Sequence, residues 1–245
     1  MASFFSDRTR LVEQYFRDWH NKFAAVGKAG DGRSRYCRLF DVFEERERRD
    51  LASPTDDKGN IITFHNCIGC NFEEGCLNIL DFVEQFSGTE KVRTYLTIYT
   101  LLFYTLAERM GVIYKELNLV DNKGEFDWIR FPVLRRIKHW ANFFKHPKSY
   151  MFLHHPDYFL ENDPDRPNFL VEGEVNSAFV DSFYKAGGKN AELRTLVKNK
   201  KDWKVIFPDL LVFTQELCAE LDGACDYVMQ PDNIETLRPF TLRDY

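Results

Sequence analysis

The sequence predicts a mainly α-helical protein, a single helical bundle over residues 1–245 with a small β-hairpin or short strands. Three observations support this prediction. Apolar side chains recur at helical spacing along most of the chain. The chain holds 23 Phe, 11 Tyr and 4 Trp, which bury large areas and can fill a core. No long structureless connection divides it, and a loop at 156–168 is the candidate for a minor domain boundary.

Helices and strands are expected in an order that the apolar spacing and the turn residues define. Ser6 and Asp7 are typical helix-capping residues, so the first helix is expected to begin there. The range 89–118 is the longest and most apolar, and we expect it at the centre of the fold. The predicted helices are 6–24, 33–52, 75–87, 89–118, 127–145, 175–186, 189–200 and 208–229. Short strands are expected at 61–66, 149–155 and 169–175, with the last two as candidates for a pair.

Charge and apolar patterning limit the classes of partner. The net charge is −5, so the chain lacks the basic surface of a protein that grips DNA along its whole face, and any nucleic-acid contact must come from a local basic patch. The most apolar run, Tyr95–Leu106, has 12 residues and is too short for a membrane span. We expect a buried core helix there and no membrane partner.

The N-terminus and the cysteine content indicate the compartment. The first residues, MASFFSDRTRLVEQYF, lack the long apolar segment of a signal peptide and place charges at Asp7, Arg8 and Arg10. Six cysteines in 245 residues do not match a small secreted disulfide scaffold. A cytoplasmic location with reduced thiols is therefore expected.

The predicted helix 127–145 carries the most informative pattern. With Arg135 at zero on a helical wheel, His139 falls at about +40°, Asn142 at about −20° and His146 at about +20°. We call these four residues the polar stripe. The opposite side of the wheel is apolar and is expected to dock on the core; its residues are Val133, Ile137, Trp140, Ala141 and Phe144.

The polar stripe combines groups suited to acid–base and phosphate chemistry. Histidine titrates near neutral pH and acts as a general acid or base, arginine offers a planar fork to phosphate, and asparagine orients either by hydrogen bonding. Arg136, Lys138 and Lys145 add positive charge and are candidate substrate-binding residues. The alternative is that the stripe is the solvent face of a surface helix, since such helices are polar opposite their apolar side.

The segment at 135–147, RRIKHWANFFKHP, resembles the signature helix of HEPN-domain proteins. That family consists of helical bundles, many of them ribonucleases of defence and toxin–antitoxin systems that commonly act as dimers. Its motif is an arginine followed after four to six residues by a histidine, often with a polar residue directly after the arginine. Asn142 and His146 match the end of the motif. Ala141 stands where the arginine belongs, and Arg135 lies upstream of the usual spacing.

The resemblance implies a metal-independent ribonuclease that acts on RNA as a homodimer. His146 would then be the general acid or base at a ribose 2′-hydroxyl, Asn142 would orient it, and Arg135 or Lys145 would stabilise the phosphorane charge. His139 completes the set of candidate catalytic residues. The alternative, favoured by Ala141 and by the acidic net charge, is a non-catalytic interaction or regulatory subunit that binds a protein partner.

A short cysteine-bearing segment is a candidate metal site. HNCIGCNFEEGC places His65, Cys67, Cys70 and Cys76 within 12 residues, and Cys-x-x-Cys spacing suits a structural zinc. Four ligands in so short a stretch would be cramped, however, and zinc sites usually take a second pair from further along the chain. The alternative is ordinary buried cysteines, together with those on apolar helix faces, Cys37, Cys218 and Cys225. Zinc is therefore the one cofactor to test, and no other is expected.

A second basic stretch lies near the last helix. The segment 198–204, KNKKDWK, is expected to be a basic turn. Basic residues around an aromatic, here Trp203, can hold single-stranded nucleic acid by charge and stacking. A solvated helix end is the alternative.

Overall fold

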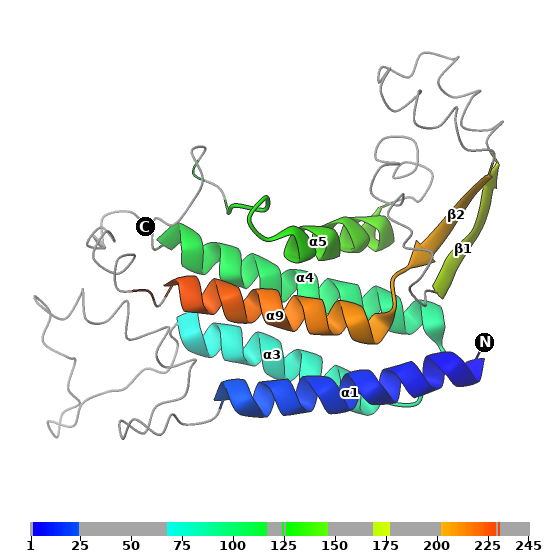
Figure 1. The fold of residues 1–245 in the computed structure, drawn as a ribbon, viewed down its shortest axis with the longest axis horizontal. Coiled ribbons are helices and arrows are strands. Elements are labelled where there is room, and N and C mark those ends of the chain that lie inside the picture. Colours follow the sequence, from blue (N-terminus) through cyan, green and yellow to red (C-terminus); the bar gives the residue numbers. More distant parts are fainter. Residues whose placement is uncertain are drawn as a thin grey trace, which may run out of the picture.

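The structure, a computed structural model, describes residues 2–24, 68–116, 124, 126–146, 169–176, 202–228 and 230, with side chains at 4–24, 71–115, 124, 126–146, 205–228 and 230. These residues form a mainly α-helical bundle, as predicted (Figure 1). Its helices are α1 (Ala2–Ala24), α3 (Ile68–Gln85), α4 (Val92–Glu116), α5 (Pro132–Lys145) and α9 (Leu210–Val228). Its strands are β1 (Phe169–Asn176) and β2 (Asp202–Phe207).

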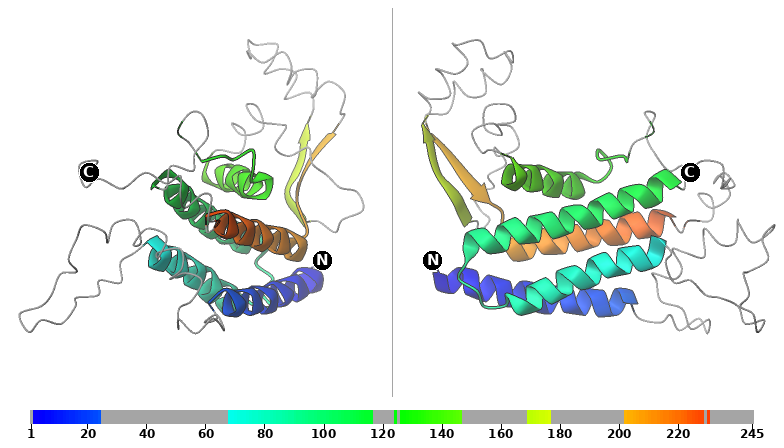
Figure 2. Two further views of the ribbon diagram at one scale, coloured as in Figure 1. Left: turned by 60° about the vertical axis from the view of Figure 1, so that its left-hand side comes forward. Right: turned by 180° about the vertical axis from the view of Figure 1, so that it is seen from behind.

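The described helices pack in a closed circuit. α1 contacts α3 and α9, α3 contacts α4, and α5 bridges α4 and α9, which also touch each other. Figures 1 and 2 show α4 and α9 between α5 on one side and α1 with α3 on the other. Among the described elements, α5 is therefore an outer helix, and the face it turns away from α4 and α9 is an outer face of the bundle.

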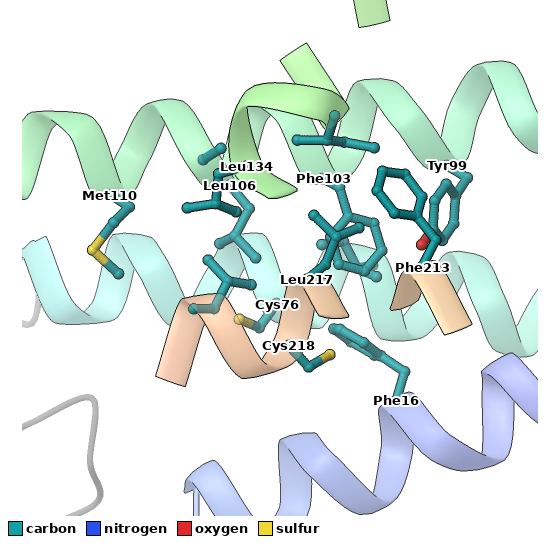
Figure 3. Packing of buried hydrophobic residues seen from close by; sticks show 14 of the residues in the cluster. Phe16, Cys76, Tyr99, Phe103, Leu106, Met110, Leu134, Phe213, Leu217 and Cys218 are labelled. Carbon is teal, nitrogen blue, oxygen red and sulfur yellow. The ribbon is translucent and has the colours of Figure 1, made fainter. Parts of the chain in front are cut away.

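The core is rich in aromatic rings, as the composition predicts. α4 lies at its centre: Tyr99 and Phe103 are buried, with ring centroids 4.7 Å apart, and Phe103 meets Phe16 of α1 edge to face at 5.6 Å (Figure 3). Tyr99 also donates to or accepts from Thr214 of α9, with 2.9 Å between the two hydroxyl oxygens. These contacts tie α4 to α1 and to α9 and exclude water from the middle of the bundle.

α4 is longer than the apolar run that suggested it. The run Tyr95–Leu106 is too short to cross a membrane, but of the helices described, the window Val92–Lys115 is the one long and apolar enough to do so by length and composition alone. Core helices of soluble proteins share this property. In the structure, α4 packs against α3, α5 and α9 of the bundle.

The first helix begins earlier than predicted. α1 starts at Ala2, and the predicted cap Ser6 lies inside the helix. The Ser6 hydroxyl donates to the Gly88 carbonyl at 2.8 Å, and the Gly88 amide donates to the Thr9 hydroxyl at 3.0 Å. Gly88 has a φ of 72°, a left-handed conformation that glycine adopts without steric penalty. A residue typical of helix caps thus serves instead to hold the α3–α4 turn against α1.

The starts of α5 and α9 are each set by a carboxylate. Residue 127 was expected inside a helix, but the Asp127 carboxylate accepts from the amides of Ile129 and Arg130 at 3.1 and 3.2 Å, which makes a turn, and α5 begins at Pro132. Asp209 caps α9 by accepting from the Val212 amide at 3.0 Å. Asp209 is almost fully buried, and its other carboxylate oxygen lies 3.0 Å from Nε of Arg8.

The two strands pair with each other in antiparallel fashion. The prediction of a strand at 169–175 is confirmed, and its partner is β2, with Phe169 opposite Phe207 and Asn176 opposite Asp202. The prediction of a basic turn through 204 is wrong for its last three residues. β-Branched and aromatic residues dominate the end of β2, where Val205 and Phe207 are buried, and this preference overrides the lysines before it.

Several predicted elements lie outside the described residues. They are the helices 33–52 and 189–200, the strands 61–66 and 149–155, and the boundary loop 156–168. The predicted helix 175–186 lies outside from residue 177 on, and its start is wrong, because Val175 and Asn176 belong to β1.

Candidate functional site

Helix α5 docks on the bundle by the side that the wheel predicts. Ile137, Trp140 and Ala141 are buried, as expected, and so are Leu134 and Phe143. The Trp140 ring lies 4.7 Å from the ring of Phe207 in β2. Val133 and Phe144, also predicted for this side, are half-buried against the same core. The apolar side therefore spans a wider arc than the sequence suggested.

The N-terminus of α5 is capped by a residue of another helix. Phe131 occupies the cap position and has no side chain that can accept a hydrogen bond. Instead, the Glu220 carboxylate of α9 accepts from the amides of Val133 and Leu134 at 2.9 and 2.8 Å. Burial raises the pKa of Glu220, and the two amide hydrogen bonds oppose that rise because they favour the carboxylate. A negative charge there also matches the positive end of the helix dipole.

Arg136 faces α9, away from the polar stripe. Its Nη1 lies 3.2 Å from Glu216 Oε2, and its guanidinium lies 5.1 Å from the centre of the Phe213 ring. Glu216 and Glu220 are one helical turn apart, so α9 holds α5 both at its end and along its side. The predicted phosphate-binding role of Arg136 would require it to leave this ion pair.

The polar stripe lies on the outward side of α5. Arg135 and His146 are exposed, while His139 and Asn142 are half-buried. The helix ends at Lys145, and His146 has extended backbone angles, although its amide still donates to the Asn142 carbonyl at 3.0 Å. Within the part of the chain that the structure describes, the side chains of Arg135, Asn142 and His146 enter no hydrogen bond or ion pair. These three groups can therefore meet a ligand without first breaking such a contact among the described residues.

Lys138 and Lys145 flank the polar stripe on the side of α4. Lys138 Nζ lies 4.5 Å from the centre of the Trp128 ring, and Lys145 Nζ lies 4.2 Å from the centre of the Tyr104 ring. Both rings are half-buried. Burial and a hydrogen bond with Glu108 raise the pKa of Tyr104 to about 12, so its hydroxyl is neutral. These lysines are thus placed by aromatic rings, which leaves their N–H donors able to bind an anion.

The charge of α5 has one sign. Its sequence, PVLRRIKHWANFFK, contains four Arg or Lys residues, one His and no acidic residue. Glu216 neutralises Arg136, and Glu220 is engaged by backbone amides. Arg135, Lys138 and Lys145 therefore leave a local positive surface on a protein whose net charge is negative, and a local patch of this kind is what any nucleic-acid contact would require.

Ala141 is the position at which the HEPN-like motif would carry an arginine, and it is fully buried. A guanidinium there would enter the aromatic core without a partner, at a large desolvation cost. The local fold therefore excludes an arginine at that point of the motif. Arg135, six residues earlier and on the outward face, is the arginine that shares the stripe with His146.

The predicted zinc ligands are only partly within the described residues. Cys76 lies buried in the core outside any disulfide, close to Cys218 of α9 (Figure 3). Burial raises the pKa of the Cys218 thiol, and the nearby Cys76 adds to that rise. Cys70 lies in the first turn of α3, whereas His65 and Cys67 lie outside the described residues. No group of three or more metal-binding side chains occurs among the residues described, and the zinc prediction stays a prediction.

Comparison of the chain with protein-family models, with curated proteins and with solved structures finds no match. The case for the candidate site therefore comes from the geometry and chemistry of its residues alone. Sequence reasoning missed four residues that shape it: Trp128, Tyr104, Glu216 and Glu220. Trp128 lies close enough in sequence to be suspected as a neighbour of α5, but the others come from α4 and α9, and no local pattern links them to α5.

Proposed function

We propose that this protein binds RNA or another phosphate-bearing ligand through the polar stripe of α5, as a HEPN-like protein, and that the stripe cleaves RNA without a metal. The single observation that carries the proposal is that α5 turns Arg135, Asn142 and His146 outward, uncommitted among the described residues, on a helix without any acidic residue. Phosphate is the ligand that such a surface suits best, because arginine and lysine bind it by charge and by several hydrogen bonds.

The proposed roles follow from the chemistry of RNA cleavage. One histidine, His146, removes the proton of a ribose 2′-hydroxyl, and the 2′-oxygen then attacks the adjacent phosphorus. The bond from phosphorus to the 5′-oxygen breaks, and a protonated group, for which His139 is the candidate as the other histidine of the stripe, gives a proton to that oxygen. Arg135 neutralises the negative charge that develops on the phosphorane. Asn142, one turn before His146, is placed to orient its imidazole when RNA binds, and no hydrogen bond joins the two side chains in the structure without RNA.

A second candidate function is a non-catalytic interaction subunit. The specific observation in its favour is the burial of Ala141, because the protein lacks an arginine at the motif position directly before Asn142. In that case α5 would bind a protein partner through the same outward face, and its histidines would have no role in proton transfer.

The deciding experiment measures binding and cleavage of labelled RNA in the presence of EDTA. We expect His146→Ala to slow cleavage by about 10²–10⁴-fold while RNA affinity changes little, as for loss of a general acid or base. Asn142→Ala and Arg135→Ala should lower cleavage too, and Arg135→Ala should also weaken binding. Matched controls are Asn78→Ala on α3 and Arg93→Ala on α4, since both residues are exposed and lie outside α5.

Two outcomes would reject the catalytic proposal. One is wild-type protein that neither binds nor cleaves RNA; the other is cleavage that the stripe variants leave at the control level. A stable complex with a co-expressed protein that forms without nuclease activity, and that Arg135→Ala disrupts, would support the interaction subunit instead. Size-exclusion chromatography of the same preparations reports whether the protein is a homodimer.

A further inference from the structure

The two lysine–aromatic pairs lie along one flank of α5. Lys138 and Lys145 are seven residues apart, which is about 10 Å along the helix axis and about 20° around it. One covers the Trp128 ring and the other covers the Tyr104 ring, at 4.5 and 4.2 Å. The flank therefore presents two cations and two ring faces in a row, beside the polar stripe.

The rings are held in place by contacts other than the lysines. Trp128 packs edge to face against buried Phe126, with centroids 4.8 Å apart and an interplanar angle of 88°. Tyr104 is fixed by the backbone of α4, and the Glu108 carboxyl one turn later interacts with its hydroxyl and helps to raise its pKa. Loss of a lysine from above either ring would leave the ring where it is, with one face open.

The lysines themselves are held weakly. A cation above a half-exposed ring is a modest attraction, and within the described part of the chain neither lysine forms an ion pair as well. A phosphate offers a full charge and several acceptor oxygens to the same ammonium group. A phosphate ligand can therefore draw each lysine from its ring, and the ring face then becomes available for stacking.

We propose that this flank binds single-stranded RNA, with Lys138 and Lys145 on successive stretches of the phosphate backbone and with unpaired bases stacked on Trp128 and Tyr104. This inference rests on the proposed function and names its substrate class. A duplex keeps its bases stacked on each other and would meet only the charges. An acidic peptide would likewise form ion pairs with the lysines, but it would place nothing against the ring faces.

The test measures the affinity of a fluorescein-labelled oligouridylate, of the matching RNA duplex and of polyglutamate for the full chain. Trp128→Leu and Tyr104→Leu should each weaken binding of the single strand by about ten-fold, as expected for loss of one stacked base, and leave duplex binding unchanged. Phe86→Leu, another half-buried aromatic in the α3–α4 turn, is the matched control. Trp128→Phe keeps a ring and should restore most of the affinity.

The lysines give the second readout. Lys138→Gln and Lys145→Gln should weaken binding of single strand and duplex alike and reduce its salt dependence, whereas Lys22→Gln and Lys91→Gln, at exposed positions outside α5, should not. Thermal unfolding of each variant identifies any that fails to fold. If Trp128→Leu fails to fold, the affinity of Trp128→Phe is compared with that of the wild-type protein instead.

The two proposals fail in different ways. If Arg135→Ala weakens RNA binding while Trp128→Leu and Tyr104→Leu match Phe86→Leu, the stripe proposal stands and the single-strand inference is overturned. Equal competition by polyglutamate and by the oligouridylate would also overturn the inference. If the wild-type protein binds no RNA at all, both proposals are rejected together.

Discussion

At the scale of single residues, two buried tyrosines of α4 differ in whether their hydroxyls are hydrogen-bonded. Tyr99 shares a 2.9 Å hydrogen bond with Thr214. Tyr95, one turn earlier on α4 and equally buried, has no hydrogen-bond partner for its hydroxyl within the described residues. Burial raises the pKa of both phenols, so each stays neutral. The same substitution at the two positions should therefore have different effects.

Tyr99→Phe is expected to lower the free energy of unfolding by about 1 kcal/mol, because it removes a buried hydrogen bond. Tyr95→Phe should be neutral or stabilising, since it removes a buried polar group that gains nothing in the folded state. Urea denaturation of both variants measures the difference. Equal losses at the two positions would show that Tyr95 finds a partner in the folded protein.

His20 links stability to pH. It is buried on α1, and burial lowers its pKa, while nearby Glu73 partly opposes the shift. A lowered pKa means that the unfolded chain binds the proton more readily than the folded one. The contribution of neutral His20 to the free energy of unfolding is therefore fully present above the ordinary histidine pKa, at about pH 6.5. It is lost as the pH falls from there toward the lowered pKa of the folded state.

The prediction for His20 concerns the slope of stability against pH. Between about pH 7.5 and 5.5, the wild-type free energy of unfolding should fall, by at most about 1.4 kcal/mol per pH unit from this residue. His20→Gln removes the titrating group and should flatten that slope, whatever it does to stability at neutral pH. Thermal denaturation across this range provides the measurement, and an unchanged slope would contradict the assignment to His20.

At the scale of elements, α5 depends on α9 for its position. Its own sequence supplies a favourable Pro132 at the first helical position but no capping side chain, and the missing acceptor comes from Glu220. Arg136 and Glu216 add an ion pair one turn further on. The helix that carries the polar stripe is thus placed by residues far from it in sequence.

Glu220→Ala should destabilise the protein by about 1–2 kcal/mol, because it leaves two helix N-terminal amides without an acceptor. Glu220→Gln should lose less, since its carbonyl oxygen can still accept one of the two hydrogen bonds. The control is Glu90→Ala, at an exposed position before α4, which should change stability by less than about 0.5 kcal/mol. Chemical denaturation followed by circular dichroism measures the free energy of unfolding of each variant. Equal stability of the Ala and Gln variants would show that no cap is lost.

At the scale of the whole molecule, a continuous aromatic core joins all the described helices. Phe103 of α4 lies within it, in ring contact with Phe16 of α1 and with Tyr99. Opposite this core, the outward face of α5 carries the positive charge. The described residues thus share one hydrophobic core and present the candidate binding surface on an outer helix of the bundle (Figure 2).

Phe103→Ala tests whether the helices unfold as one unit. The loss of a fully buried ring should lower the free energy of unfolding by about 3–5 kcal/mol. Val112→Ala, on the same helix but more than half exposed, should cost less than about 0.5 kcal/mol. Unfolding followed by tryptophan fluorescence and by circular dichroism should give coincident transitions. Separate transitions would show that the bundle is not a single cooperative unit.

Much of the helical fold was predictable from local spacing. Residues three and four apart share a face whatever the surroundings, so the apolar side of α5, with Ile137 and Trp140, and its polar stripe follow from sequence alone. The strand at 169–175 was also recognisable, because its residue types and the loop residues before it are features of the local sequence. The polar stripe remains a prediction as a site of chemistry; its outward placement is what the structure adds.

Contacts between distant segments were not predictable in this way. Glu220 reaches α5 from 86 residues away, Tyr104 reaches Lys145 from α4, and β2 finds β1 across a long connection. Ser6 shows the converse, because a typical capping residue serves the α3–α4 turn once tertiary packing brings Gly88 near. The sequence by itself determined which faces are apolar and which are polar, since those depend only on helix periodicity. The tertiary structure alone decided what each face meets, because hydrogen-bond and ring partners are set by how the helices pack.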